Sequence, residues 1–279
     1  MKGLSPFTGF SAAFQYLFID QFGVLHDGRR PYPGAVEALK ALKARGARVV
    51  ILSNSGRSGQ FNARRMETLG IPRGLYDHFL TSGDVARTAL LDGELPIALG
   101  PATRCMTISS SGERDLAEGL GLTIVEDGAL ADLLIISGSE GDRVPLAEYE
   151  RRIGPAASRH APCLCTNPDK LMLASGGTHP GAGAIAELYE ALGGVVSWIG
   201  KPYPAIYAAA ARLVGSPEPP RVLCIGDSVE HDIVGAHRFG AAAALVRTGI
   251  LANLSERELA AECAKHGVVA DLILKDLEG

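Results

Sequence analysis

The sequence lacks the long apolar runs of a membrane protein and the positive charge of a nucleic-acid-binding protein. None of its uninterrupted apolar stretches approaches the ~18 residues of a membrane-spanning helix. The formal net charge of the 279 residues is −4, and the pI is near 6.0. These features favour partners other than membranes and nucleic acids. Hydrophobic residues make up 47% of the chain, enough to bury a full core in one large domain or two smaller ones.

Cysteine is also scarce, and its odd number of five argues against a disulfide framework. Cys163 and Cys165 form a Cys-x-Cys pair with no second pair to complete a metal site, so we interpret them as reduced positions in a strand. A reducing cytoplasmic location is the expectation that follows. The N-terminal stretch MKGLSPFTGFSAAFQYLF is mildly apolar, but Ser, Thr, Gly and Gln dilute it. It is interpreted as a lead-in to a first strand rather than a signal peptide.

Internal repeats and low-complexity linkers are absent, and short apolar runs alternate with helix-like segments instead. This alternation predicts an α/β fold with a parallel sheet, in which ligands bind at the carboxyl ends of the strands. The glycine-rich stretch Ser175–Gly183 is predicted to form tight turns before a helix, and Trp198 a core position. The predicted strands cover residues 16–19, 48–52, 133–136, 222–225 and 243–246, and the predicted helices 33–45, 58–69, 183–192 and 204–213.

Two of the predicted strands end in polar residues. Asp20 closes the first strand in FIDQFGVL, where a carboxylate can serve as a nucleophile or metal ligand, or as a turn residue. The strand RVVILSNSG ends at Ser53, Asn54 and Ser55, followed by Gly56. These side chains can bind a phosphate, or they can cap the following helix.

Two further segments carry charged residues that could join these polar groups in one site. In RVLCIGDSVEHDIVGAHRFG, Asp227 and Asp232 are five residues apart, across a loop and the start of a helix. Their spacing suits a divalent cation, although acidic residues also favour a helix start through its dipole. Lys201 precedes Pro202, which holds it extended. It can offer a fixed positive charge to a phosphoryl group or to Asp20, or it can be a solvated surface residue.

Taken in order, the aspartate strand, the Ser/Asn strand, Lys-Pro and the Gly-Asp…Asp segment resemble the haloacid dehalogenase superfamily over nearly the whole chain. The resemblance implies a Rossmann-like, doubly wound parallel-sheet core at residues 1–85 and 199–279, with an inserted α/β cap of the C2 type at 86–198. It also implies Mg²⁺ as the cofactor. The implied roles are a nucleophile at Asp20, phosphate binding by Ser53, Asn54, Ser55 and Lys201, charge stabilisation by Lys201, and Mg²⁺ ligation by Asp20, the Phe22 carbonyl, Asp227 and Asp232. Asp232 can be a direct ligand or can instead hold another ligand in place.

The middle segment CTNPDKLMLASGGTHPGAGAIAELYEALGG is similar to the Thr-Asn-x-Asp…Pro-Gly-x-Gly signature of subfamily IIA. That branch contains phosphoglycolate, pyridoxal-phosphate and nitrophenyl-phosphate phosphatases, so the resemblance implies a small phosphorylated metabolite as substrate. It also allows a homodimer, because caps of this type often help to form dimers. Asn167, Asp169 and His179 are candidates for substrate contacts, with turn and cap roles favoured.

Phe22 departs from the phosphatase pattern, which places a second aspartate two residues after the nucleophile. That aspartate protonates the leaving alcohol and later deprotonates water, so its absence predicts weak catalysis, least so for good leaving groups. A non-catalytic protein that binds Mg²⁺ and a phosphometabolite is one alternative. A metal-independent dehalogenase, with an aromatic residue at this position, is a second, but Asp227 and Asp232 argue against it. Recruitment of His26 as a substitute acid/base is disfavoured, because its loop is expected to lead away from the site.

Overall fold

The computed structural model describes residues 7–100, 102–174 and 177–278 and divides the chain into two compact units. The first comprises residues 1–53, 59–80 and 201–279, and the second residues 54–58 and 81–200. Residues 1–6 of the N-terminal stretch and residues 175–176 of the glycine-rich stretch lie outside the described ranges. Within those ranges, no helix has the length and apolar character needed to cross a membrane.

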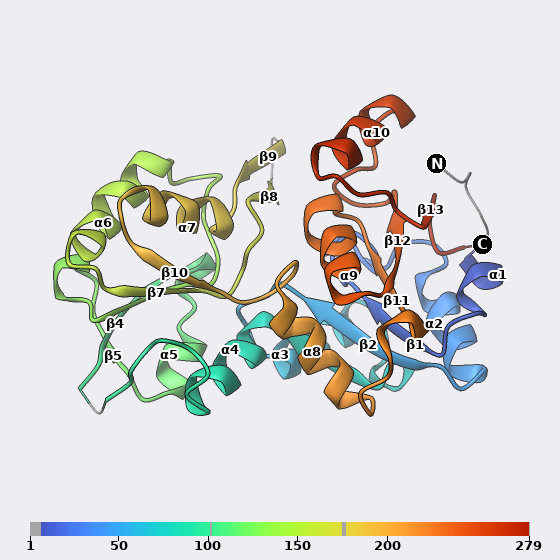
Figure 1. Cartoon of the computed structure of the whole chain (residues 1–279), viewed down its shortest axis with the longest axis horizontal. Helices are drawn as coiled ribbons and strands as arrows, with labels where there is room; N and C mark the ends of the chain where they lie inside the picture. The colour runs from blue at the N-terminus through green and yellow to red at the C-terminus, as the bar shows by residue number, and fades with distance from the viewer. Residues whose placement is uncertain (1–6, 101, 175–176, 279) are drawn as a thin grey trace. The chain divides into compact units, whose positions relative to one another are not determined.

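The first unit is built on a six-stranded sheet of order β13-β12-β11-β1-β2-β3. Figure 1 shows the blue strands β1 and β2 beside the orange β11, so the sheet joins both ends of the chain. Its strands are β1 (Tyr16–Ile19), β2 (Arg48–Ser53), β3 (His78–Thr81), β11 (Val222–Gly226), β12 (Ala242–Val246) and β13 (Leu272–Leu274). Its helices are α1 (Phe7–Ser11), α2 (Ala35–Ala44), α3 (Gly59–Thr68), α8 (Pro204–Leu213), α9 (Val234–Phe239) and α10 (Glu256–Lys265). Short 3₁₀ turns at Arg73–Leu75 and Pro219–Arg221 and a π-helical turn at Val229–Ile233 complete it.

The second unit contains a five-stranded sheet of order β10-β7-β6-β4-β5 and an antiparallel hairpin, β8-β9. Its strands are β4 (Arg104–Ile108), β5 (Thr123–Ile124), β6 (Leu133–Ile136), β7 (Pro162–Cys165), β8 (Leu171–Ala174), β9 (Gly177–Pro180) and β10 (Val195–Trp198). Its helices are α4 (Ser82–Leu91), α5 (Asp115–Gly119), α6 (Leu146–Ser158) and α7 (Ala182–Ala191), with 3₁₀ turns at Ser110–Gly112 and Gly128–Leu130.

The predicted α/β fold with parallel sheets is confirmed, and the core of the first unit is Rossmann-like. All five predicted strands and all four predicted helices are present, with ends shifted by at most two residues. Cys163 and Cys165 lie in β7, and none of the five cysteines, all of them described, forms a disulfide. The assignment of the second unit as a C2-type cap stays a prediction.

Two local predictions were wrong. Residues 177–180 form strand β9 instead of tight turns, because pairing with β8 satisfies their backbone groups. Trp198 lies at the edge of the core and not inside it. Its indole Nε1 donates to Glu190 Oε1 at 3.0 Å, which keeps one end of the ring near solvent.

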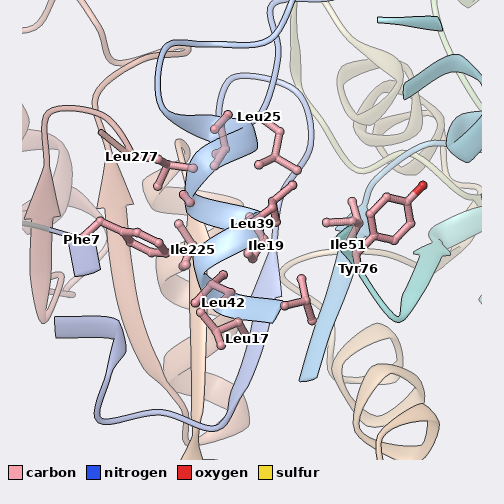
Figure 2. Close-up of a cluster of buried hydrophobic side chains, with 14 of the residues drawn as sticks. Phe7, Leu17, Ile19, Leu25, Leu39, Leu42, Ile51, Tyr76, Ile225 and Leu277 are labelled. Carbon is pink, nitrogen blue, oxygen red and sulfur yellow. The ribbon is translucent and has the colours of Figure 1, made fainter. Parts of the chain in front are cut away.

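The apolar core of the first unit lies where α2 packs on the sheet (Figure 2). Leu39 and Leu42 of α2 are three residues apart, on one face of the helix, and both are buried. They pack in one cluster with Leu17, Ile19 and Ile51 of the two central strands. Burial of each such side chain stabilises the fold by roughly 1.5–3 kcal/mol, which fixes the strands whose ends carry the polar residues.

Asp77 directly precedes β3 and bonds through its side chain to β2 and α2. Replacing it tests how much these bonds stabilise the first unit. Its Oδ2 accepts the Val49 N–H at 2.7 Å and its Oδ1 lies 2.8 Å from Lys43 Nζ. Burial raises the pKa of Asp77, but these hydrogen bonds outweigh it and leave the pKa below its ordinary value. We expect Asp77→Ala to lower the free energy of unfolding by ~2–3 kcal/mol near neutral pH, as measured by urea denaturation.

The effect of Asp77→Ala depends on pH with a definite sign. Because the pKa of Asp77 is lower in the folded protein than in the unfolded chain, its stabilisation is present above the unfolded value and is lost as the pH falls through the folded one. The difference between wild type and variant should therefore shrink in acid. Glu37→Ala is the control, since its carboxylate is 72% exposed and should matter by less than ~0.5 kcal/mol. A pH-independent difference would contradict the role of the carboxylate.

Candidate active site

Three neighbouring parallel strands bring the predicted site residues of the first unit together. The pairing of Ile19 with both Ile51 and Ile225 aligns the carboxyl ends of β1, β2 and β11. Asp20 follows β1, and its N–H donates to the Ile225 carbonyl at 2.8 Å. Ser53 is the last residue of β2, and Asp227 directly follows β11.

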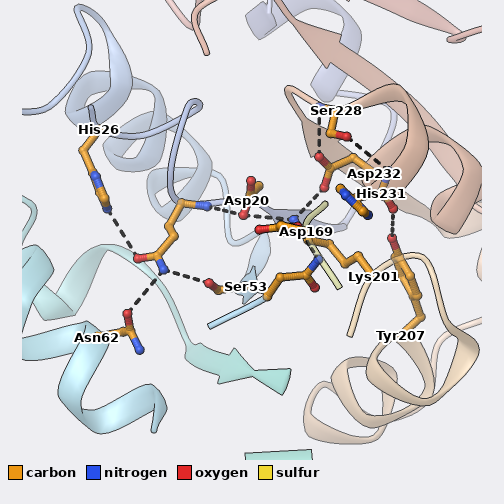
Figure 3. Close-up of polar contacts among 12 residues, drawn as sticks. Asp20, His26, Ser53, Asn62, Asp169, Lys201, Tyr207, Ser228, His231 and Asp232 are labelled. Carbon is orange, nitrogen blue, oxygen red and sulfur yellow. Dashed lines mark hydrogen bonds and ion pairs between the residues drawn. The ribbon is translucent and has the colours of Figure 1, made fainter. Parts of the chain in front are cut away.

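Asp20, Asp227 and Asp232 form a carboxylate cluster. One carboxylate oxygen from each residue lies within 4.8 Å of the oxygens from the other two. Lys201 Nζ joins two of them, at 2.9 Å from Asp20 Oδ1 and 2.7 Å from Asp232 Oδ1 (Figure 3). The side chain of Lys201 is 4% exposed, which rules out the alternative of a solvated surface lysine.

The aspartates are held by backbone donors as well as by Lys201. Asp232 lies at the start of a helix, as predicted, in a π-helical turn that leads directly into α9. Its Oδ2 accepts the Ser228 N–H at 3.1 Å. Asp227 Oδ2 accepts the Ile250 N–H at 2.8 Å. These bonds hold both carboxylates toward the cluster.

The electrostatics of the cluster favour a bound divalent cation. Burial raises the pKa of Asp20, and the charges of Asp232 and Asp227 raise it further, against the opposing effect of Lys201. Burial alone would lower the pKa of Lys201, but Asp20 and Asp232 raise it above its ordinary value. If a cation bound with all three carboxylates as ligands, one ammonium would face three negative charges, an excess of two at a buried place. Oxygen ligands with this excess charge fit a hard divalent cation such as Mg²⁺.

Glycines provide the space that these carboxylates occupy. A Cβ added to Gly226 would lie 1.9 Å from Asp232 Cγ, and one added to Gly249 would lie 1.8 Å from Asp227 Oδ2. Gly23, at φ +84°, approaches the same Asp227 oxygen. Sequence reasoning missed Gly249, because it stands in a loop after β12 with no motif around it.

We expect Gly249→Ala to weaken Mg²⁺ binding by ~10–100-fold, because the added methyl group displaces the Asp227 carboxylate. Isothermal titration calorimetry with MgCl₂ measures this directly and does not depend on turnover. Gly74→Ala is the matched control, since no atom lies within 4 Å of the added methyl group. Equal Mg²⁺ affinity of the Gly249→Ala variant and wild type would show that Asp227 is not a ligand.

Ser53 has a partner that sequence reasoning missed. Its Oγ lies 2.7 Å from Gln21 Nε2, and both residues are buried.

His26 was expected on a loop leading away from the site, but this was wrong. Its Nε2 lies 3.4 Å from Gln21 Oε1, and burial and Arg65 lower the pKa of His26 to about 4. The only sign of these Gln21 contacts in the sequence is that Gln21 directly follows Asp20.

Phe22 lies in the turn that follows Asp20. The residue is 40% exposed, and its ring meets the His26 ring edge-on, with centroids 5.9 Å apart. The phenyl side chain carries no ionisable proton, so Phe22 supplies no acid or base. Ligation of a cation by its carbonyl oxygen stays a prediction.

The other predicted site residues belong to the second unit. Asn54 Nδ2 donates to Asp169 Oδ1 at 2.8 Å, and the Ser55 carbonyl accepts the Gly83 N–H at 3.1 Å. Asn167 Oδ1 accepts the Asp169 N–H at 3.2 Å, the turn role that the sequence favours. His179 lies in β9. Phosphate or substrate contacts by these residues stay predictions.

Comparison with known proteins agrees with this arrangement. A family model described as haloacid dehalogenase-like hydrolase matches residues 17–123, and a second, HAD-hydrolase-like model matches residues 198–276. Chronophin of Rattus norvegicus is 30% identical over 275 residues, 91% of this chain and 83% of that protein.

Two solved structures share the fold over nearly their whole length. A haloacid dehalogenase-like hydrolase from Brucella suis 1330 is 28% identical, with a TM-score of 0.83 over 98% of this chain and 99% of that one. The p-nitrophenyl phosphatase from Archaeoglobus fulgidus is 26% identical, with a TM-score of 0.73 over 95% of this chain and 97% of that one. From these matches and the carboxylates at the strand ends, we conclude that the chain belongs to the haloacid dehalogenase-like hydrolase family.

Proposed function

We propose that the protein is a Mg²⁺-dependent phosphatase that hydrolyses a small phosphorylated metabolite through an aspartyl phosphate at Asp20. The observation that carries this proposal is the carboxylate cluster, with Lys201 bridging Asp20 and Asp232. The similarity to a p-nitrophenyl phosphatase supports the same class of substrate.

In this mechanism the Asp20 carboxylate attacks phosphorus, the bond to the ester oxygen breaks, and water then attacks the phosphorus of the aspartyl phosphate to release phosphate. Asp20, Asp227 and Asp232 would hold Mg²⁺, which neutralises charge on the transferring phosphoryl group. Lys201 keeps the Asp20 oxygen in place and offsets its charge. The Ser53 hydroxyl binds a phosphoryl oxygen.

Phe22 limits this chemistry at the leaving group. It has no proton to give to a departing alkoxide and none to take from the attacking water, and loss of a general acid/base typically costs ~10²–10⁴ in rate. An aryl phosphate departs as a stabilised phenolate, so it depends least on the missing proton. We propose that the protein is correspondingly weak on alkyl phosphates.

Hydrolysis of p-nitrophenyl phosphate tests the proposal. We expect turnover with MgCl₂, loss of turnover with excess chelator, and recovery when Mg²⁺ is restored. Calorimetry on the same samples reports Mg²⁺ binding separately. Absence of turnover with Mg²⁺ bound would overturn the catalytic proposal in favour of a phosphometabolite-binding protein, and turnover unaffected by chelation would overturn the role of the metal.

A further inference from the structure

Gln21 connects the proposed nucleophile to the proposed phosphate-binding hydroxyl. Its main-chain N–H donates to Asp20 Oδ1 at 2.8 Å. Its side-chain Nε2 lies 2.7 Å from Ser53 Oγ, and the residue is 9% exposed. Its carbonyl accepts the N–H groups of Leu25 and His26, at 2.8 and 3.2 Å, which fixes the turn. One buried residue therefore contacts both groups that would meet a phosphoryl substrate.

The direction of each hydrogen bond follows from one backbone donor. The Gly28 N–H lies 3.0 Å from His26 Nδ1, and a backbone N–H only donates, so Nδ1 is the acceptor. A neutral imidazole with a bare Nδ1 carries its hydrogen on Nε2. That hydrogen faces Gln21 Oε1, which only accepts, at 3.4 Å. This contact is long, and its main effect is on orientation.

The His26 Nε2–H therefore favours one orientation of the Gln21 amide. With Oε1 toward His26, both hydrogens of Nε2 are directed at oxygens, Ser53 Oγ at 2.7 Å and Asn62 Oδ1 at 3.3 Å (Figure 3). The reversed amide would place Oε1 against Asn62 Oδ1 and Nε2 against the His26 Nε2–H. Two acceptors would then meet at one end of the amide and two donors at the other, so the reversed orientation is disfavoured.

We propose that Gln21 is a positioning residue. By donating from Nε2 to Ser53 Oγ, it makes this oxygen an acceptor on the side that faces Gln21, and so directs the Ser53 hydroxyl hydrogen to the phosphoryl group. The chain of donors runs from Gly28 through His26, Gln21 and Ser53 to the substrate. Each bond polarises the next, which strengthens the last one. This inference rests on the proposed function, because it assigns a role within the same phosphate site.

Binding of inorganic phosphate in the presence of Mg²⁺, measured by calorimetry, tests this role without requiring turnover. Gln21→Met keeps the length of the side chain and removes its donors. We expect Gln21→Met and Ser53→Ala each to weaken phosphate binding by about 3–10-fold. The double variant should bind no more weakly than Ser53→Ala alone, since Gln21 acts through the hydroxyl that is already lost.

Each outcome identifies which statement fails. If Gln21→Met has no effect, or weakens binding equally with and without the Ser53 hydroxyl, the positioning role is overturned. If Ser53→Ala leaves phosphate binding unchanged, the phosphate-binding role of Ser53 itself is wrong, and the inference falls with it. Gln15→Met makes the same chemical change at an exposed position before the other end of β1 and should leave phosphate binding unchanged.

A second measurement addresses the wild-type chain and does not depend on the folding of any variant. Nitrogen-15 NMR of His26 at neutral pH should show the neutral tautomer with hydrogen on Nε2. A hydrogen on Nδ1 would require the Gly28 N–H to lose its acceptor and would reverse the deduced direction of every bond up to Ser53. That result would overturn the proposal.

Discussion

Replacing Asp20 with Asn is expected to lower kcat for p-nitrophenyl phosphate by at least ~10³-fold. The amide has nearly the shape of the carboxylate, but its nitrogen and neutral oxygen are poor nucleophiles. The hydrogen bond from the Asp20 main-chain N–H to the Ile225 carbonyl does not involve the side chain, so the Asn variant retains it. The loss therefore reports the chemistry of the carboxylate, not the position of the turn.

The same substitution should not destabilise the protein in the absence of metal. Burial and the charges of Asp232 and Asp227 raise the pKa of Asp20, so the ionised carboxylate is disfavoured in the metal-free fold. Removing one of three clustered carboxylates relieves this repulsion, although it also removes one partner of Lys201. We expect thermal unfolding without metal to show a melting temperature equal to or above that of wild type.

Two controls complete the Asp20 experiment. Single-turnover trapping with a rapid acid quench should recover phosphorylated protein from wild type and none from Asp20→Asn. Asp127→Asn, an exposed carboxylate that caps a 3₁₀ turn of the second unit, should retain wild-type kcat. Wild-type kcat in the Asp20→Asn variant would exclude Asp20 as the nucleophile.

The sequence predicted the strands and the polar residues at their ends because both depend on local patterns. Apolar runs of four to six residues bounded by Gly and polar residues predict buried strands, and parallel pairing then brings Asp20, Ser53 and Asp227 to one edge of the sheet. The position of Lys201 against Asp20 follows from the same topology, since Lys201 begins the segment that leads back into the first unit.

Residues that act across long loops were not predictable in this way. Gly249 is needed because its loop passes close to Asp227, and nothing in its neighbouring residues records that approach. The contact between Gln21 and Ser53 joins positions 32 apart in the sequence and depends on side-chain direction. Residues 177–180 belong to a glycine-rich stretch with the composition of turns, but pairing with β8 outweighs that local preference.

Replacing Phe22 with Asp is expected to raise kcat/KM for alkyl phosphates by ~10²–10⁴-fold, because it supplies the general acid/base that the site lacks. This gain corresponds to a barrier lower by about 3–5.5 kcal/mol. For p-nitrophenyl phosphate the gain should be smaller, since nitrophenolate leaves without a proton. Phe22 is 40% exposed, so removal of its ring should cost little stability.

The matched control is Phe22→Asn, which has the size of the aspartate variant without its proton. It removes the aromatic ring from beside His26 in the same way, so any gain shared by both variants would come from loss of the ring. We expect no gain in Phe22→Asn, and a larger gain on alkyl than on aryl phosphates in Phe22→Asp. Equal rates in wild type and Phe22→Asp on both substrates would mean that proton transfer at residue 22 does not limit turnover. Another group would then handle the leaving-group proton, and the neutral, amide-bonded His26 is poorly suited to that role because its pKa is lowered to about 4.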